Sequence, residues 1–278
     1  MIAGRAKGIV TAALLASVLA VVGCAKSETR STDGSADAAA SPEKSRQATA
    51  SRKPTAAERA IAQARVENKH AFILFYHPGE QASDTMRDTF KRAEAKLRSK
   101  AAFTLIDVSV DTESRLIEQY GVRQAPLPLT LVMAPNGAIV NAFTKPVEEK
   151  ALAGAFVSPK VAEVSKALQD RKLVALCLQG AGTKHNTESR QAAQQFVGDS
   201  RLGGQAVLVT VDPSKESDLL KRCGIRSIPT ESTIVMLLPP GQLVASVTGG
   251  TTKDALLAKL QAALASCGSG CGPSGCGQ

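Results

Sequence analysis

The sequence predicts an α/β protein with two tandem domains, each a mixed central sheet flanked by helices, preceded by a signal peptide and a disordered linker. Three observations lead to this expectation. An apolar run and a long polar stretch open the chain, the remainder matches itself at an offset of 103 residues, and each copy alternates helices with strands. A repeated unit of this kind is typical of tandem α/β domains.

The composition supports packed cores and argues against some classes of function. Of the 278 residues, 44% are hydrophobic and 21% are charged. Only 3% are aromatic, so recognition of nucleic acids or sugars by stacking is not expected. The net charge of +9 is spread out, with +1 over 57–157 and +4 over 158–278. No segment forms the concentrated basic stripe that phosphate binding needs, so we expect no nucleic-acid partner.

The first 23 residues have the pattern of an export signal. Arg5 and Lys7 precede an uncharged run over 8–23, which ends at Cys24. This run is shorter than the ~20 residues of a spanning helix and ends in small residues, which predicts a cleaved signal peptide over 1–23. Val21-Val-Gly-Cys24 resembles the lipobox of bacterial lipoproteins. The resemblance implies diacylglyceryl attachment at Cys24 and N-acylation; an ordinary secretory peptide with an incidental cysteine is the alternative.

A lipid on Cys24 would anchor the mature protein to the membrane without spanning it. Several acyl chains hold a protein firmly, whereas one chain binds only marginally. We therefore expect a cell-envelope protein at the periplasmic or extracytoplasmic face. The lipoprotein resemblance further implies the outer membrane where there are two membranes, because Ala25 stands where retention signals of the family often place Asp. Residues 24–54 are polar with no apolar period, which predicts a disordered tether.

The region after the tether consists of two copies of one unit. Three stretches match, namely Phe103–Val108 with Ala206–Val211, Tyr120–Pro126 with Cys223–Pro229, and Leu131–Gly137 with Val235–Gly241. The offset grows from 103 to 104 residues in the third match. We therefore expect domains over 55–157 and 158–265, followed by a Gly- and Cys-rich flexible tail over 266–278.

Both copies are expected to place their elements in the same order. In the first copy these are a helix over 57–68, a strand over 71–76, helix 83–99, strand 103–108, helix 112–120, a hairpin turn at 135–137 and helix 147–156. In the second they are helix 159–170, strand 173–178, helix 187–197, strand 206–211, helix 215–223, a turn at 239–241 and helix 251–265. Apolar spacing near 3.6 indicates the helices, and short apolar runs indicate the strands. Ser158 and Pro159 suit an N-cap and a first helical position.

This order and several motifs resemble the thioredoxin fold in both copies, over about 55–265. The motifs are Ile73-Leu-Phe-Tyr76, Tyr120-Gly-Val-Arg123 and Pro135-Asn-Gly137 in the first copy, and Val174-Ala-Leu176, Cys223-Gly-Ile-Arg-Ser-Ile-Pro229 and Pro240-Gly241 in the second. The resemblance implies a proline in cis just before the hairpin, beside a substrate-facing groove. Pro229 matches that proline in the second copy. In the first, Pro126 fits the upstream spacing and Pro128 fits the downstream spacing.

The cysteine pair that thioredoxin catalysis needs is absent from both copies. The family pattern places Cys-x-x-Cys where the helix after the first strand begins, because the helix dipole lowers the thiol pKa there. Here the two positions fall on Glu80 and Ser83 in the first copy, and on Gly182 and His185 in the second. We therefore expect no dithiol exchange at either standard site.

Two loop histidines and one basic run are weaker candidates. His77 and His185 could serve metal or acid–base chemistry, but neither has a carboxylate or thiol at ligand spacing, so we expect both to be solvated. The basic residues of the second helix are Lys91, Arg92, Lys96, Arg98 and Lys100, with Glu94 among them. This mixture predicts a solvated face rather than a ligand site.

Two isolated cysteines lie in the second copy. Cys177 is expected where Phe75 stands in the first copy, and Cys223 replaces Tyr120. Buried cysteines often behave as small hydrophobic residues, which is the interpretation we favour. An exported location also allows a disulfide between them, provided that their Cα atoms lie within about 7 Å.

Three further cysteines, Cys267, Cys271 and Cys276, lie in the tail among glycines. Such a sequence disfavours a stable helix or strand, so we expect a mobile segment with three thiols. Soft thiolates suit Cu(I), or Zn²⁺ with a fourth ligand from elsewhere. An internally oxidised tail and a mixed disulfide with a partner are alternatives, and no other cofactor is expected.

These patterns favour a membrane-anchored, thioredoxin-like scaffold or chaperone. It would be redox-inactive at the standard sites and would bind a peptide or protein partner in grooves near Pro126 or Pro128 and near Pro229. One alternative is a thiol–disulfide oxidoreductase that uses Cys177 and Cys223 or the tail thiols. Another is copper or zinc handling through the tail.

Overall fold

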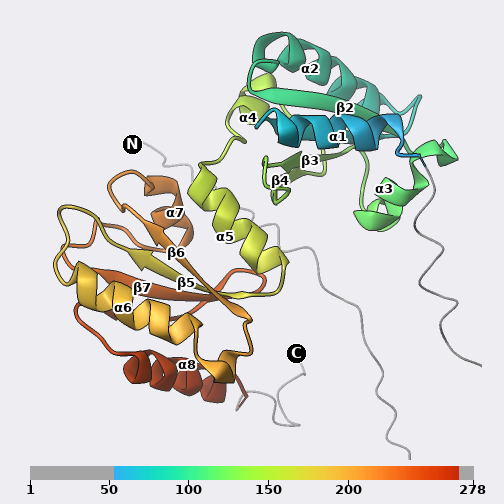
Figure 1. Ribbon diagram of the computed structural model, residues 1–278. Coiled ribbons are helices and arrows are strands. Elements are labelled where there is room, and N and C mark those ends of the chain that lie inside the picture. The colour runs from blue at the N-terminus through green and yellow to red at the C-terminus, as the bar shows by residue number, and fades with distance from the viewer. Residues whose placement is uncertain (1–52, 269–278) are drawn as a thin grey trace, which may run out of the picture. The chain divides into compact units, whose positions relative to one another are not determined.

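A computed structural model describes residues 53–268 of the chain (Figure 1). The expected signal peptide, the lipid site at Cys24 and most of the tether lie outside the described residues, as do Cys271 and Cys276. Within residues 53–268, no helix is both long enough and apolar enough to cross a membrane.

The first repeat, residues 53–157, contains four strands and four α-helices among its described residues. Its elements are α1 (Ala56–Val66), β1 (His70–Tyr76), α2 (Gln81–Leu97), β2 (Ala101–Asp107), η1 (Asp111–Glu113), α3 (Ser114–Gln119), η2 (Val122–Gln124), β3 (Leu129–Met133), β4 (Ile139–Phe143) and α4 (Glu149–Ala153). The strands form one sheet in the order β2-β1-β3-β4. β1 is parallel to β2 and antiparallel to β3, and β4 pairs antiparallel with β3.

The second repeat, residues 158–268, builds a second sheet with the same topology. Its elements are α5 (Pro159–Gln169), β5 (Leu173–Leu178), α6 (Asn186–Val197), η3 (Ser200–Leu202), β6 (Ala206–Val211), α7 (Ser217–Arg222), β7 (Thr233–Leu238), β8 (Gln242–Thr248) and α8 (Lys253–Gly268). The strand order is β6-β5-β7-β8. The prediction of two tandem mixed sheets flanked by helices is therefore confirmed.

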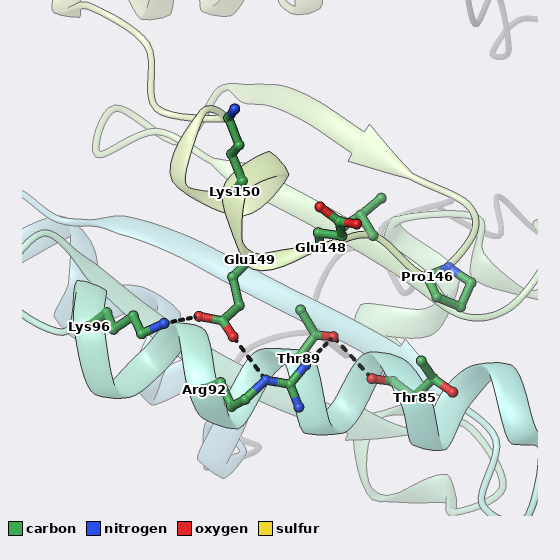
Figure 2. Close-up of a pocket in the computed structure, with 9 residues that line it drawn as sticks. Thr85, Thr89, Arg92, Lys96, Pro146, Glu148, Glu149 and Lys150 are labelled. Carbon is green, nitrogen blue, oxygen red and sulfur yellow. Dashed lines mark hydrogen bonds and ion pairs between the residues drawn. The ribbon is translucent and has the colours of Figure 1, made fainter.

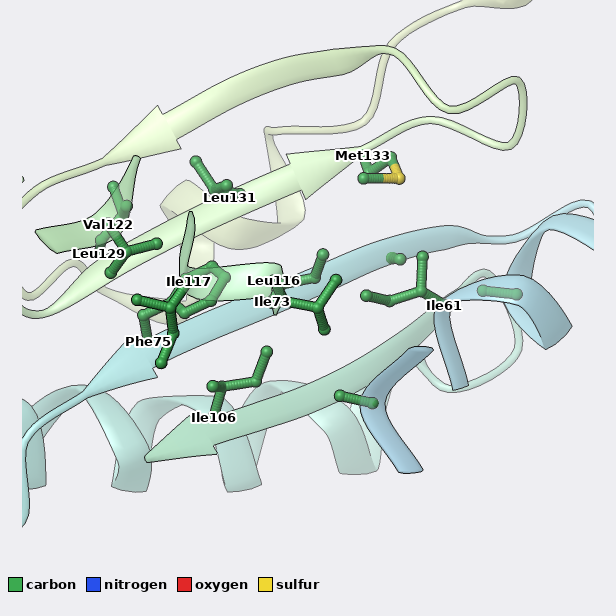
Figure 3. Packing of buried hydrophobic residues seen from close by; sticks show 13 residues of the cluster. Ile61, Ile73, Phe75, Ile106, Leu116, Ile117, Val122, Leu129, Leu131 and Met133 are labelled. Carbon is green, nitrogen blue, oxygen red and sulfur yellow. The ribbon is translucent and has the colours of Figure 1, made fainter. Parts of the chain in front are cut away.

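Each sheet carries a hydrophobic cluster on both faces. In the first repeat, Ile61 of α1 and Ile117 of α3 pack on one face with Ile73 and Phe75 (Figure 3). Phe90 of α2 packs on the other face, in a cluster with Phe72, Leu74 and Leu152. The central strands are buried on both sides, which explains why their sequences are continuous apolar runs.

The hydroxyl of the N-cap residue caps the first helix of each repeat. Thr55 and Glu58 form a capping box, with the Glu58 amide donating to Thr55 Oγ1 at 3.2 Å. Ser158 Oγ accepts from the Val161 amide at 3.1 Å and donates to the Glu216 carboxylate at 2.6 Å. Local cap chemistry therefore starts α5 where the sequence predicts it.

The last helix extends further than expected. We expect it to end at Ala265, but α8 continues to Gly268, so Cys267 belongs to the helix. The preceding segment is rich in alanine and leucine, which are strong helix formers, and this propensity carries the helix into the glycine-rich sequence.

Candidate functional site

The loop between β1 and α2 holds the two positions expected for the missing cysteines. Residues 77–80 are exposed, whereas Ser83, in the first turn of α2, is completely buried. Ser83 Oγ accepts from the His77 amide at 3.3 Å and donates to Glu80 Oε2 at 3.4 Å. The helix start is therefore held by hydroxyl and carboxylate hydrogen bonds, with no thiol at either position.

A proline loop adjoins this helix start in the first repeat. The pairing of Phe75 with Leu129 places the end of β1 beside Pro128, the residue just before β3. The Leu127–Pro128 bond is cis, whereas the bond before Pro126 is trans. Of the two candidates that the sequence leaves open, Pro128 is thus the one in cis.

A different residue occupies the same place in the second repeat. β7 begins at Thr233, which pairs with Leu178 at the end of β5. The residue just before the strand is therefore Ser232, and the bond before Pro229 is trans, unlike our expectation. Three residues separate Pro229 from Ser232, so the match in sequence does not carry over to the position in space.

Hydrogen bonds close the site of the second repeat. The Lys184 amide donates to the Thr230 carbonyl at 3.0 Å, and the Ser232 amide donates to the Lys184 carbonyl at 2.8 Å. The Gly249 amide donates to the Ser232 carbonyl, and Ser189 Oγ donates to the Gly249 carbonyl, both at 2.8 Å. These bonds join the loop before α6, the loop before β7 and the loop after β8 at the start of α6. Proline has no amide hydrogen, so Pro128 cannot form the corresponding bond in the first repeat.

Ser189, rather than His185, is the buried residue at the start of α6. Ser189 is completely buried, as Ser83 is in α2. His185 is the N-cap residue, with a φ of 61°. Its exposed ring approaches Glu188 Oε2 at 3.0 Å, so a carboxylate does lie within reach of this histidine, contrary to our expectation. Gly182, the other expected position, is exposed in the loop, with open space around its α-carbon.

The two cysteines of the second repeat are free and belong to different clusters. Cys177 points into the cluster of α6 and α8, and Cys223 packs against the cluster of α5 and α7 on the opposite face of the sheet. Strand pairing shows that the counterpart of Cys177 is Leu74 and not Phe75, which corrects our expectation. Leu74 pairs with the second residue of β3, Thr130, and Cys177 pairs with the second residue of β7, Ile234. A disulfide between Cys177 and Cys223 is therefore not formed.

Burial makes both thiols poor nucleophiles. It raises the pKa of Cys177 above its ordinary value, although a hydrogen bond from Ser232 opposes the shift. Cys177 Sγ lies 3.7 Å from both Ser232 Oγ and Gln179 Oε1. Burial likewise raises the pKa of Cys223. Because the thiolate is the reactive form, neither environment favours thiol chemistry near neutral pH.

The basic face of α2 borders a groove of about 610 Å³ (Figure 2). Its lining residues are Thr85, Thr89, Arg92, Lys96, Pro146, Val147, Glu148, Glu149 and Lys150. Arg92 Nε and Lys96 Nζ lie 2.9 and 2.5 Å from the Glu149 carboxylate. Both cations are thus exposed and paired with Glu149 of α4.

No metal centre is assembled within residues 53–268. No group of three His, Cys, Asp or Glu residues in this part of the chain converges as metal ligands do. His77 Nδ1 instead lies 3.0 Å from the Pro78 carbonyl oxygen. The tail thiols at Cys271 and Cys276 lie outside these residues, so metal binding by the tail stays a prediction.

Comparison with known proteins adds thioredoxins as structural neighbours. No protein-family model matches the chain, and no curated protein matches it. Among solved structures, the thioredoxin Deadhead of Drosophila melanogaster is 25% identical and covers 33% of this chain and 85% of its own, with a TM-score of 0.28. A thioredoxin of Malassezia sympodialis is 19% identical and covers 34% and 81%, with a TM-score of 0.29. Thioredoxin-2 of a malaria parasite is 15% identical and covers 31% and 80%, with a TM-score of 0.28. Each neighbour spans about one third of the chain, and the two four-stranded mixed sheets themselves define the fold class.

Proposed function

We propose that the protein is a membrane-anchored, extracytoplasmic thioredoxin-like scaffold that performs no dithiol exchange and binds an extended segment of a partner protein. The binding site is the first-repeat loop, Ala125–Pro128. The observation that carries this proposal is the contrast between the two repeats. Both have a buried serine at the helix start, but only the second closes the adjacent loop with Ser232.

The absence of exchange chemistry follows from the side chains at the helix starts. Dithiol exchange proceeds through a mixed disulfide that a second thiol resolves. Ser83 and Ser189 carry hydroxyls, which form no disulfide. Cys177 and Cys223 cannot replace them as a pair, because they pack on opposite faces of one sheet.

The first-repeat loop has the features of a strand-binding edge. Pro126 is exposed and Leu127 is half-buried, next to the exposed loop 77–80. The Leu127 amide precedes the β3 ladder, which begins at Leu129, and no hydrogen bond joins it to any of residues 53–268. A partner segment can satisfy this backbone group by adding as a strand, while its side chains contact the adjacent apolar surface.

Membrane anchoring is supported by the N-terminal sequence. A lipoprotein signal is indicated by three features together, namely the positive charges of Arg5 and Lys7, the uncharged run that follows, and Cys24. The polar stretch after Cys24 would serve as the linker between the lipid anchor and the folded part. Mass spectrometry of the mature protein tests this directly. We expect a lipidated Cys24 at the N-terminus, and a mature chain with an unmodified Cys24 would contradict it.

Strand binding is tested with an unfolded probe, reduced and carboxymethylated α-lactalbumin. We expect binding to the chain that begins at Lys53, and about tenfold weaker binding by Leu127→Glu, because a charge would have to be desolvated in the site. Glu231 occupies the place of Leu127 in the second repeat, so Glu231→Leu is the matched control and should leave binding unchanged. Equal binding by Leu127→Glu and the unmodified chain would exclude the first-repeat loop.

The redox prediction needs a separate assay. We expect no insulin reduction by the same protein in the presence of dithiothreitol beyond the rate of the reductant alone. Turnover that disappears in Cys177→Ala or Cys223→Ala would show that the protein is a thiol enzyme.

A further inference from the structure

The β8 edge, one of the two edges of the second sheet, lacks the features that usually prevent strand addition. β8 forms this edge over seven residues, Gln-Leu-Val-Ala-Ser-Val-Thr, with no charge and no proline. Exposed edge strands normally carry a charge or a proline, or are covered by another element, because unpaired backbone groups recruit other strands. An edge of this length and composition is therefore expected to be covered in the working protein.

The hydrogen-bond pattern identifies which backbone groups face outward. The Gly249 amide donates to the Ser232 carbonyl directly opposite, so this pair faces β7. Bonded and non-bonded pairs alternate in an antiparallel ladder, and the backbone of Ser246 and Thr248 therefore points away from β7. Both residues are exposed, and outside the sheet ladder no hydrogen bond joins either backbone amide to any of residues 53–268.

The corresponding edge of the first sheet is bonded by a side chain at its first residue. Gln169 of α5 donates its side-chain amide to the Ile139 carbonyl at 2.6 Å and accepts from the Ile139 amide at 3.0 Å. A side chain thus takes the place of a neighbouring strand at this residue of β4. In the second sheet, Leu243 is the counterpart of Ile139, because each pairs with the residue that follows the bulge in its sheet. Leu243 is 43% exposed.

A groove accompanies the uncovered edge. It has a volume of about 610 Å³ and runs from the loop 223–231 to the side chains of Leu243, Ser246 and Thr248. Ile228, which is 59% exposed, lies on its rim. A strand added to β8 would extend the floor of this groove and cover apolar surface at the same time.

We propose that a second copy of this chain adds its own β8 antiparallel to the first, with Ser246 opposite Ser246 of the second copy, to form a continuous eight-stranded sheet. In such an isologous pair the residue on the axis faces itself, so any charge near the axis would meet a like charge. β8 has none. Its outward backbone groups at Ser246 supply the two hydrogen bonds of the central pair.

The chain's own tail fits this edge less well. The residues after α8 are Ser-Gly-Cys-Gly-Pro-Ser-Gly-Cys-Gly-Gln, and glycine and proline are depleted in strands. A charged partner strand would find no opposite charge on β8. A second copy, in contrast, brings the same uncharged, β-branched sequence to the pair. This proposal concerns the second repeat and does not depend on strand binding by the first-repeat loop.

The test is the mass in solution of the chain from Lys53 to Gln278, which forms one compact unit. Sedimentation equilibrium in the presence of reductant, which prevents disulfides between tails, is expected to show twice the mass of the chain. Ser246→Lys and Ser246→Glu should each give the mass of one chain, because like charges face each other on the axis. Mixing the two variants should restore the double mass, and Ser246→Thr is the matched control that should stay a dimer.

Each other result overturns the proposal. A monomeric unmodified chain, or a Ser246→Lys variant that keeps the double mass, shows that β8 is not the interface. Failure of the mixed charge variants to associate contradicts the isologous register. Because Ser246 is exposed, the variants should retain the unmodified circular dichroism spectrum and thermal midpoint, which confirms that any loss of mass arises at the interface.

Discussion

Replacing Ser232 by proline should open the site of the second repeat. Ser232 is completely buried, and its amide donates to the Lys184 carbonyl at 2.8 Å. Ser232→Pro removes this donor and leaves the rest of the loop sequence unchanged. The first repeat has proline at the same place, so the substitution gives the second repeat the backbone chemistry of the first.

The structure sets the size of this effect. Loss of one hydrogen bond that leaves its acceptor unpaired costs about 1–3 kcal/mol. The carbonyl belongs to Lys184, an exposed residue, which favours the lower half of that range. A change of about 1.4 kcal/mol is tenfold in an equilibrium constant, so the loop should open about tenfold more often.

Hydrogen exchange measures this opening at the Lys184 amide, which donates to the Thr230 carbonyl at 3.0 Å. We expect exchange there to accelerate about tenfold in Ser232→Pro. In Ser232→Ala it should change little, because alanine keeps the amide and loses only the hydroxyl that lies 3.7 Å from Cys177. Equal protection in the proline variant and the unmodified chain would refute the view that this bond closes the loop.

Three further predictions concern stability and its pH dependence. Phe90 is 2% exposed, and its ring meets that of Phe103 edge-on with the centroids 5.3 Å apart. In urea denaturation, Phe90→Ala should therefore lower the free energy of unfolding by about 3–5 kcal/mol. The control Val66→Ala, at an 80% exposed position, should change it by under about 0.5 kcal/mol. Burial lowers the pKa of His70 below its ordinary 6.5, so the unfolded chain binds a proton at this residue before the folded chain does. The free energy of unfolding should therefore fall as the pH drops below 6.5. If His70→Phe lost the same amount of free energy over this pH range, the prediction would be contradicted. Burial raises the pKa of Cys177 above its ordinary 9.0, so the stability that the neutral thiol contributes should be lost as pH rises past 9.0, and Cys177→Ala should reduce this loss in denaturation at several pH values.

The element positions were largely predictable because their signals are local. Ser158 and Pro159 define the start of α5 through cap chemistry, and continuous apolar runs define β1 and β5. In the short first-repeat loop, Glu80 is the N-cap of α2 and Ser83 lies in its first turn, although the sequence predicts a helix that begins two residues later, at 83. Where a few adjacent residues determine the backbone, the sequence is enough.

The second site was less predictable because its loops differ in length. Residues 77–80 separate β1 from α2, whereas residues 179–185 separate β5 from α6. The residue spacing of the thioredoxin family therefore assigns the second cysteine position to His185, whereas the buried residue at the helix start is Ser189. In the same way, Pro229 fits the sequence motif, but three more residues precede β7. A constant offset cannot follow such insertions.

The sequence by itself determined the tandem organisation, the mixed α/β class and the lack of a cysteine pair at either helix start, since periodicity, repetition and residue identity are properties of the chain. Only the tertiary structure decided that Cys177 and Cys223 lie on opposite faces of a sheet, that the Ser232 amide bonds Lys184 where Pro128 has no amide to donate, and that β8 is an edge strand. Side chains alternate between faces along a strand, so a shift of one residue in register exchanges the faces. That register is set by pairing between strands far apart in the chain.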